Sequence, residues 1–196
     1  MRKVILLIML LILTLAFTSC SNGGTGMGVF EDNDEKIADK TFNEIITAIS
    51  LQDDSKIVDM FSNSIKSEDN SVDNLSQSAL KFFEFIHGDI VAFSSASEAG
   101  VGTDYRIESG KKRKEIQSAF CINTTENTYY IAIKECIKDE FDDNNIGIMS
   151  IYIIESNNWT ENYVYRGDGK WIPGINIVSP GKANGMTRGG GRMNNE

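Results

Sequence analysis

The sequence predicts an α+β domain in which three N-terminal helices pack on one face of a curved antiparallel sheet. From about residue 34 to Gly88, apolar residues recur every three or four positions, which is the spacing of helices with one buried face. After Gly88, apolar and polar residues alternate, which is typical of half-buried strands. The connections between these strands are short, and this favours antiparallel hairpins because parallel pairs need long crossovers. Helices that precede all the strands are expected to lie together on one face of the sheet.

Three stretches carry the helical pattern. The first has its apolar face behind an acidic start, which suits the positive end of a helix; this face contains Ala38, Phe42, Ile45, Ile46 and Ile49. A shorter helix with Ile57 and Met60 follows residues 53–55, each of which can cap it. The third helix begins at Asn70 or Ser71 and ends before Gly88, a residue suited to helix termination.

The second half predicts a meander of strands. The first strand is expected over residues 90–96, followed by a loop of small residues over 97–103. The next begins near Tyr105 or resumes after Gly110. The later strands are expected over residues 114–123, 128–138, 146–155 and 171–178. The last of them contains Pro173, which is tolerated in an edge strand.

Residues 1–19 are organised like an export signal. Arg2 and Lys3 precede fourteen apolar or near-apolar residues, 4–17, and a small-residue cleavage site follows. A membrane span needs about 20 apolar residues, so this run is short for one. Cys20 after Thr18 and Ser19 resembles the lipobox of bacterial lipoproteins, although Phe17 departs from its usual leucine. The resemblance implies a lipid anchor, with fatty acids such as palmitate, on Cys20 at the extracytoplasmic face of the cell membrane. Ordinary secretion and an uncleaved anchor are the alternatives.

Composition and charge limit the expected partners and domain organisation of the mature chain. Loss of residues 1–19 removes two of the 19 basic residues and none of the 28 acidic ones, which leaves a formal net charge of −11. Nucleic acid is therefore excluded as an expected partner, because its binding needs clustered Lys and Arg. We expect a lipidated cysteine and flexible tether over residues 20–33, a single domain over 34–178 and a disordered glycine-rich tail over 179–196.

Glu135 is the leading candidate for chemistry. The expected strand places its carboxyl group on the same face as Ile131 and Ile133. Burial there would raise the pKa of Glu135 and suit it to general acid or base work. A place at the rim of the fold, or a bond to a backbone group or a lysine, is the alternative. Tyr129 and Tyr152 are the tyrosines that could polarise a carbonyl group beside it.

The other chemistry-bearing residues form no recognisable set. His87, the single histidine, ends a helix, where it suits the helix dipole better than a role as base. Cys121 and Cys136 are expected as free, buried thiols, with a disulfide as the alternative; a hairpin turn over 123–127 would place Cys121 opposite a residue near Tyr130. One His and two separated Cys do not make a metal site.

Two charged stretches have alternative interpretations. The acidic residues of the 139–145 loop offer oxygen ligands for weak calcium binding, but their spacing lacks the usual calcium-loop pattern. The basic run 111–114 could contact an anionic bilayer, or pair with the chain's own acids.

The order of elements resembles the nuclear transport factor 2-like cone fold, in which helices close over a bent sheet and leave a pocket. The chain also resembles a family of small lipoproteins of low-GC Gram-positive bacteria, domain of unknown function 5104, over residues 38–177. The residues that carry the resemblance are 38–42 (ADKTF), 45–49, 82–88, 110–116, 145–153 and 172–175 (IPGI). They are core and turn positions, so the resemblance implies a fold and no chemistry.

These observations predict a lipid-anchored, non-catalytic domain that binds a small apolar molecule or an envelope protein, without a cofactor. Tyr129, Glu135 and Tyr152 are its candidate ligand-binding residues. One alternative is an isomerase- or dehydratase-like enzyme with Glu135 as base. Another is a structural role in envelope or spore assembly, with an interface of exposed aromatic residues, Trp159, Tyr163 and Trp171.

Overall fold

The computed structural model describes residues 34–67, 71–158 and 171–178. The expected signal, tether and glycine-rich tail lie outside the described residues, as do Trp159 and Tyr163. Within the described part, no helix has the length and apolar character needed to cross a membrane.

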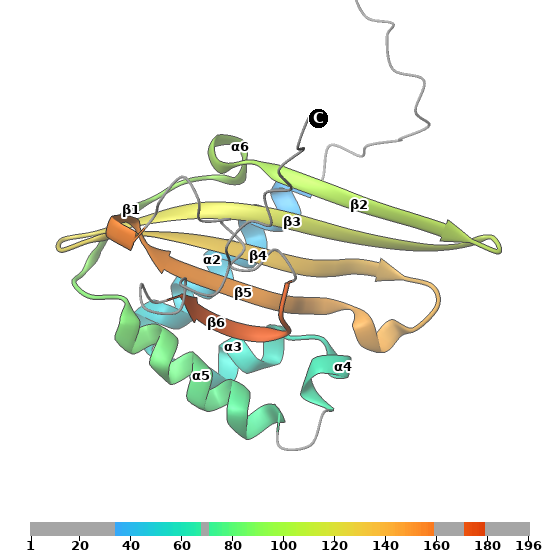
Figure 1. Ribbon diagram of the computed structural model, residues 1–196, viewed down its shortest axis with the longest axis horizontal. Coiled ribbons are helices and arrows are strands. Elements are labelled where there is room, and N and C mark those ends of the chain that lie inside the picture. Colours follow the sequence, from blue (N-terminus) through green and yellow to red (C-terminus); the bar gives the residue numbers. More distant parts are fainter. Residues whose placement is uncertain (1–33, 68–70, 159–170, 179–196) are drawn as a thin grey trace, which may run out of the picture. The chain divides into compact units, whose positions relative to one another are not determined.

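A six-stranded sheet forms one layer of the domain (Figure 1). Its strands are β1 (Ile90–Phe93), β2 (Val101–Glu108), β3 (Lys111–Thr124), β4 (Thr128–Asp139), β5 (Gly147–Glu155) and β6 (Gly174–Val178). The order is β1-β3-β4-β5-β6, and β2 also pairs with β3. Because β2 pairs with the first part of β3 and β1 with its end, β1 and β2 together form one edge of the sheet.

The hairpins between β2, β3, β4 and β5 confirm the predicted antiparallel meander. The last strand differs, because β6 is parallel to β5 and begins at Gly174, after Pro173. The connection spans residues 156–173, which exceeds the dozen or so residues that a parallel crossover requires. Strand β2 begins at Val101, earlier than predicted. A two-residue turn, Ser109 and Gly110, connects it to β3, and both residues have positive φ, as in a type I′ hairpin.

The first half is helical, as predicted: α2 (Asp34–Leu51), α3 (Asp54–Met60) and α5 (Ser71–Phe85) are the three expected helices. Of the three candidate caps of α3, Asp53 is the one used, and its carboxylate accepts a 3.0 Å hydrogen bond from the Lys56 N–H. A further single turn, α4 (Asn63–Lys66), is too short to leave a periodic signal.

The predicted first strand is too long by three residues. The observed strand β1 ends at Phe93, and the short helix α6 (Ala96–Ala99) replaces the end of the predicted strand and part of the expected loop. The Glu98 carboxylate accepts a 2.8 Å hydrogen bond from the Ser95 N–H at the start of this helix. The Ala96 N–H donates to Asp39 of α2 at 2.7 Å, so α6 is fixed to the first helix.

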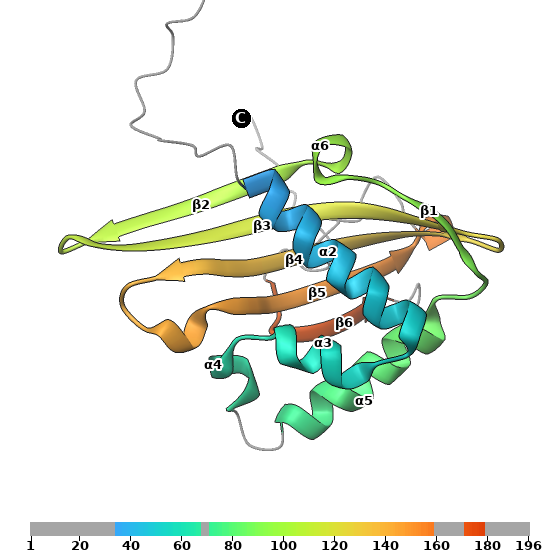
Figure 2. The same ribbon diagram turned by 180° about the vertical axis from the view of Figure 1, so that it is seen from behind.

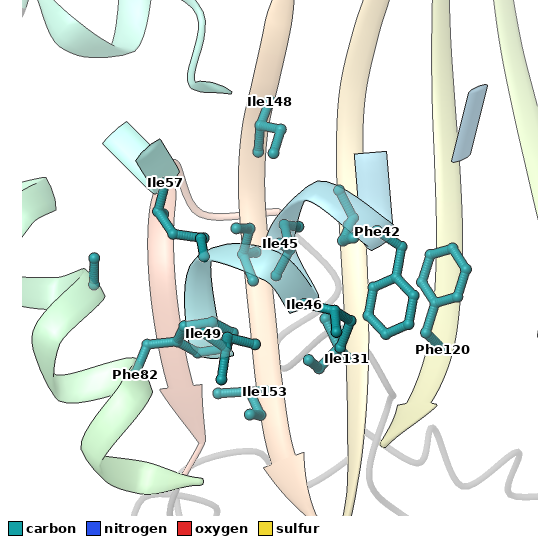
Figure 3. Packing of buried hydrophobic residues seen from close by; sticks show 14 of the residues in the cluster. Phe42, Ile45, Ile46, Ile49, Ile57, Phe82, Phe120, Ile131, Ile148 and Ile153 are labelled. Atoms are coloured by element: carbon teal, nitrogen blue, oxygen red, sulfur yellow. The ribbon is translucent and has the colours of Figure 1, made fainter. Parts of the chain in front are cut away.

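Helix α2 lies across one face of the sheet, with α3 and α5 beside it (Figure 2). Apolar side chains fill the layer between helices and sheet (Figure 3). Phe42 stacks on Phe120 of β3 with ring centroids 3.9 Å apart. Further along α2, Ile45 and Ile49 are buried in the same layer. The core therefore has the helix-on-sheet arrangement that the apolar spacing predicts.

Gly147 lets the short helices approach the sheet. Its φ is +126°, and a Cβ there would lie 2.8 Å from the Ser62 backbone nitrogen. The Ser62 N–H in turn donates to the Ile148 carbonyl at 2.9 Å. A larger residue at position 147 would therefore separate the α3–α4 junction from β5.

Candidate functional site

Glu135 lies near the middle of the sheet, between Ile116 of β3 and Ile148 of β5. The alternation along β4 points its side chain to the helix-covered face, together with Ile131 and Ile133. Only 6% of the residue is exposed. The sequence therefore predicted its burial among apolar residues correctly.

Within the described residues, one hydroxyl group donates a hydrogen bond to the Glu135 carboxyl group. Thr41 Oγ1 of α2 donates to Glu135 Oε2 at 2.9 Å. The other oxygen, Oε1, is buried and has no hydrogen-bond partner among the described residues. Ser118 Oγ of β3 is a second such atom on the same face, because Ser118 pairs with Ile133, two residues before Glu135 on β4.

This environment favours the neutral acid. Burial raises the pKa of Glu135 to about 7; the nearby Glu44 charge acts in the same direction, and the Thr41 hydrogen bond partly opposes it. The carboxyl group therefore changes charge near neutral pH, which is the range suited to proton transfer and to pH-dependent packing.

The structure does not bring the candidate tyrosines to Glu135. Tyr129 lies on the same strand face, but six residues away, about 20 Å at the usual rise of a strand. Its hydroxyl group accepts a 2.9 Å hydrogen bond from the His87 N–H. Tyr152 points to the opposite face of the sheet, where its hydroxyl group accepts from the Ile172 N–H at 2.8 Å. Trp171 packs edge-on against Tyr152.

His87 and the cysteines occupy separate places. His87 is exposed in the loop after α5. Both described cysteines are free, as predicted, and Cys121 lies opposite Tyr130. Cys136 is buried, but Cys121 is only half-buried, because its side of the edge-proximal strand β3 is less covered.

In the acidic loop, the Asp139 carboxylate is bound by groups of the same domain. Asp139 accepts hydrogen bonds from the backbone N–H groups of Phe141 and Asp142 and from Asn145 Nδ2. It also lies 3.4 Å from Arg113 Nη1. Burial alone would raise the pKa of Asp139, but these hydrogen bonds and the Arg113 charge outweigh it and lower the pKa below its usual value.

The basic run divides into two halves. Lys111 and Lys112 are exposed. Arg113 contacts Glu115 at 2.5 Å, and Lys114 contacts Asp34 of α2 at 2.6 Å. Two of the four cations therefore pair with the chain's own acids, in line with the second of the two interpretations of this run.

The β1–β2 edge, defined here by strands β1 and β2, is a feature that the sequence analysis missed. It exposes four large apolar side chains, those of Val91, Phe93, Tyr105 and Ile107. The apolar residues at 101, 105 and 107, which alternate with polar ones, are the available signal. The prediction places residues 97–103 in a loop and begins the next strand near Tyr105 or after Gly110, so it misses the full length of β2. Only the pairing with β3 shows that it is an edge strand.

Comparison with known proteins adds a family. No curated protein matches the chain. The family described as Domain of unknown function (DUF5104) matches residues 44–156, which is more than half of the sequence and runs from α2 to the 3-10 turn after β5. The matched region includes Glu135 and the whole β1–β2 edge, but not Thr41. The chain therefore belongs to the DUF5104 family of domains of unknown function.

Proposed function

We propose that this chain is a lipid-anchored, extracytoplasmic binding domain that takes an extended segment of a protein at the β1–β2 edge. The observation that carries the proposal is the exposure of four large apolar side chains along an edge strand pair. An open edge binds an extended segment through backbone hydrogen bonds, and the side chains beside it supply apolar contact.

Support for the anchor comes from the sequence of residues 1–20. The basic start, the apolar run and Cys20 after two small residues have the organisation of a lipoprotein signal. A domain held at the membrane by this cysteine would meet other proteins of the envelope. The cone fold that the chain resembles is consistent with the observed helices on one face of the sheet.

The packing of the core favours a protein partner over a small apolar ligand. The pocket of a cone fold would lie between the helices and the sheet. Here that layer contains the stacked rings of Phe42 and Phe120 and the buried side chains of Ile45 and Ile49 (Figure 3). Four of the nine large apolar side chains that are exposed within the described residues lie at the β1–β2 edge instead.

An enzyme that uses Glu135 as a general base is the second candidate function. Its support is the buried carboxyl group, whose pKa burial raises to about 7. Against it, Tyr129 lies about 20 Å away along the strand and Tyr152 points to the other face. Glu135→Gln should leave capture of a partner at the edge unchanged if the first proposal holds, whereas the enzyme would lose its base.

Two measurements test the binding proposal in a bacterium that exports lipoproteins. Cys20→Ser should remove the lipid mass from the chain and move it out of the membrane fraction. The photoreactive amino acid p-benzoylphenylalanine in place of Val91 or Tyr105 should give a defined protein adduct on illumination. The same amino acid in place of Leu51, which is exposed at the end of α2, should not. Equal labelling at all three positions would reject the edge as a binding site.

A further inference from the structure

We propose that the partner strand at the β1–β2 edge is β2 of a second copy of this chain, paired antiparallel about a two-fold axis at Tyr105. This inference rests on the proposed function, because it names the partner of the same edge. Three features of β2 carry it: its regularity, the direction of its open backbone groups and the order of its charges.

Strand β2 carries charged side chains but lacks the bulges and prolines that often protect an edge. Its register with β3 is continuous over eight residue pairs, from Val101 opposite Ser118 to Glu108 opposite Lys111, with no bulge and no proline. Natural edge strands are commonly short, bulged or interrupted by proline. The neighbouring β1 has a register shift after Ile90, and β6, at the other edge, follows Pro173. Strand β2 is therefore the best template for a further strand within the described sheet.

The open backbone groups of β2 belong to its odd-numbered residues. The Ala119 N–H donates to the Gly100 carbonyl at 3.3 Å, which makes position 100 a hydrogen-bonded position next to β3. Bonded and non-bonded positions alternate along an antiparallel pair, so the even-numbered residues of β2 bond to β3. The odd-numbered residues direct their N–H and C=O groups away from it; they are Val101, Thr103, Tyr105 and Ile107. Among the described strands, β2 pairs with β3 alone.

The charges of β2, together with its end at Glu108, select one register. If Tyr105 faces its own copy, Asp104 faces Arg106 of the partner subunit, and the same contact recurs by symmetry. If Arg106 is central, it faces its own copy and Asp104 faces Glu108 of the partner subunit. If Asp104 is central, it also faces its own copy. Opposite charges across a strand pair stabilise it and like charges destabilise it, which favours Tyr105 or Ile107 as the centre. With Ile107 central, Arg106 faces Glu108 of the partner subunit, but only residues 106–108 of each strand pair, because β2 ends at Glu108. With Tyr105 central, residues 102–108 pair, so Tyr105 is the favoured centre.

This register also covers the exposed apolar side chains of β2. Tyr105 is 52% exposed and Ile107 is 61% exposed, and both share the helix-facing side of β2 with Thr103, which donates to Asp34 of α2. In the dimer, Tyr105 would pack against its own copy, and Ile107 would face Thr103 of the partner subunit. Within one chain, Asp104 contacts Gln117 and Arg106 contacts Glu108. Both contacts are exposed, so replacing them by contacts to a partner costs little free energy of folding.

Charge reversal tests the register on the full-length chain in mild detergent, with the dissociation constant measured by sedimentation or native mass spectrometry. Asp104→Arg and Arg106→Glu should each weaken the dimer by about tenfold or more, because each puts like charges opposite each other twice. The double variant Asp104→Arg/Arg106→Glu should recover the dimer. An equimolar mixture of the two single variants should form a heterodimer.

Glu108→Arg is the matched control. It lies on the same strand and the same face as Asp104 and Arg106, but opposite Gly102 of the partner subunit when Tyr105 is central. The variant should therefore leave the dimer unchanged. Strengthening would indicate the Arg106-centred register and weakening the Ile107-centred register, and either result would overturn ours. A chain that stays monomeric, or single variants without effect, would also overturn the inference. Thermal unfolding of each variant verifies that its fold is retained.

Photo-crosslinking in the exporting cells separates this inference from the proposed function. With p-benzoylphenylalanine in place of Tyr105, an adduct of two copies of the chain is the expected result. An adduct with a different protein would overturn the self-pairing and leave the proposed binding function standing. Absence of any adduct at Tyr105, or equal labelling at Leu51, would overturn both.

Discussion

Glu135 and Asp139 lie four residues apart on β4, and burial affects them in opposite ways. Both are almost inaccessible, with 6% and 2% of each residue exposed. Yet the pKa of Glu135 is raised to about 7 by burial, whereas hydrogen bonds lower the pKa of Asp139 in spite of burial. Three N–H donors and Arg113 surround Asp139, whereas within the described residues Glu135 accepts one hydrogen bond, from Thr41. The donors around each carboxyl, together with how deeply it lies in the domain, decide whether it stays ionised.

The two residues therefore give the fold opposite pH dependences. Between the ordinary value of 4.5 and about 7, folded Glu135 holds a proton that the unfolded chain has released, so the stability due to this group falls as pH rises. The lowered pKa of Asp139 has the reverse effect: its contribution is present above the ordinary value of 3.8 and is lost as pH falls through the lower folded value.

Removal of Asp139 should have the largest effect. Asp139→Ala leaves three donors of the 139–145 loop without their acceptor and removes one of the two acidic partners of Arg113, which keeps Glu115. The loss of three hydrogen bonds to a charged acceptor should lower the free energy of unfolding by about 4 kcal/mol. Urea unfolding at pH 7 measures it. Asp143→Ala, at an exposed position of the same loop, is the control and should stay within about 0.5 kcal/mol of the wild type. Equal stability of both variants would show that Asp139 is dispensable.

Glu135→Gln should have a smaller effect that appears only at higher pH. The amide has the size of the acid but carries no charge, so the variant should match the wild type near pH 4.5 and exceed its stability by about 3 kcal/mol at pH 8. Unfolding measured at several pH values would show the difference grow across this window. A difference that does not change with pH would mean that Glu135 has the same pKa in the folded and unfolded chain.

Glu126→Gln is the control for this pH series. Glu126 lies in the exposed turn between β3 and β4, where its backbone N–H donates to Thr124 Oγ1 at 3.2 Å. Its substitution should leave the pH profile parallel to that of the wild type. A profile altered as much as that of Glu135→Gln would mean that the effect does not come from the buried position.

The difference between these two carboxyls also shows how far the sequence could lead. Alternation along β4 predicted the burial of Glu135, because its neighbours at 131 and 133 share its face. It could not predict Thr41 as partner, which lies 94 positions away on another element. Asp139 was grouped with its acidic neighbours as an exposed loop, because the donors that hold it, at 141, 142 and 145, are defined by the turn geometry. Local periodicity predicts which face of a strand a side chain lies on, whereas contacts between distant elements determine its hydrogen-bond partners.

The same limit applies to the strands. The hairpins were predictable because adjacent strands with short connections pair with each other. The parallel placement of β6 and the split of one edge into β1, α6 and β2 depend on which strand each segment meets, which composition does not encode. The exposed residues Tyr105 and Ile107 were therefore identified only from the pairing.

The smallest effect is expected for Thr41, whose hydroxyl group donates the hydrogen bond that Glu135 accepts within the described residues. Thr41→Val keeps the size of the side chain and removes the 2.9 Å hydrogen bond to Oε2, which should raise the pKa of Glu135 further. The loss of stability should be about 1–2 kcal/mol at pH 8, where the carboxylate is charged, and smaller at pH 5. Thr41→Ser retains a hydroxyl group and should stay closer to the wild type at pH 8. A carbon-13 NMR titration of the Glu135 carboxyl measures the pKa change directly. If the valine and serine variants titrate alike, the hydroxyl group does not bond the carboxylate in solution, and burial alone sets the protonation of Glu135.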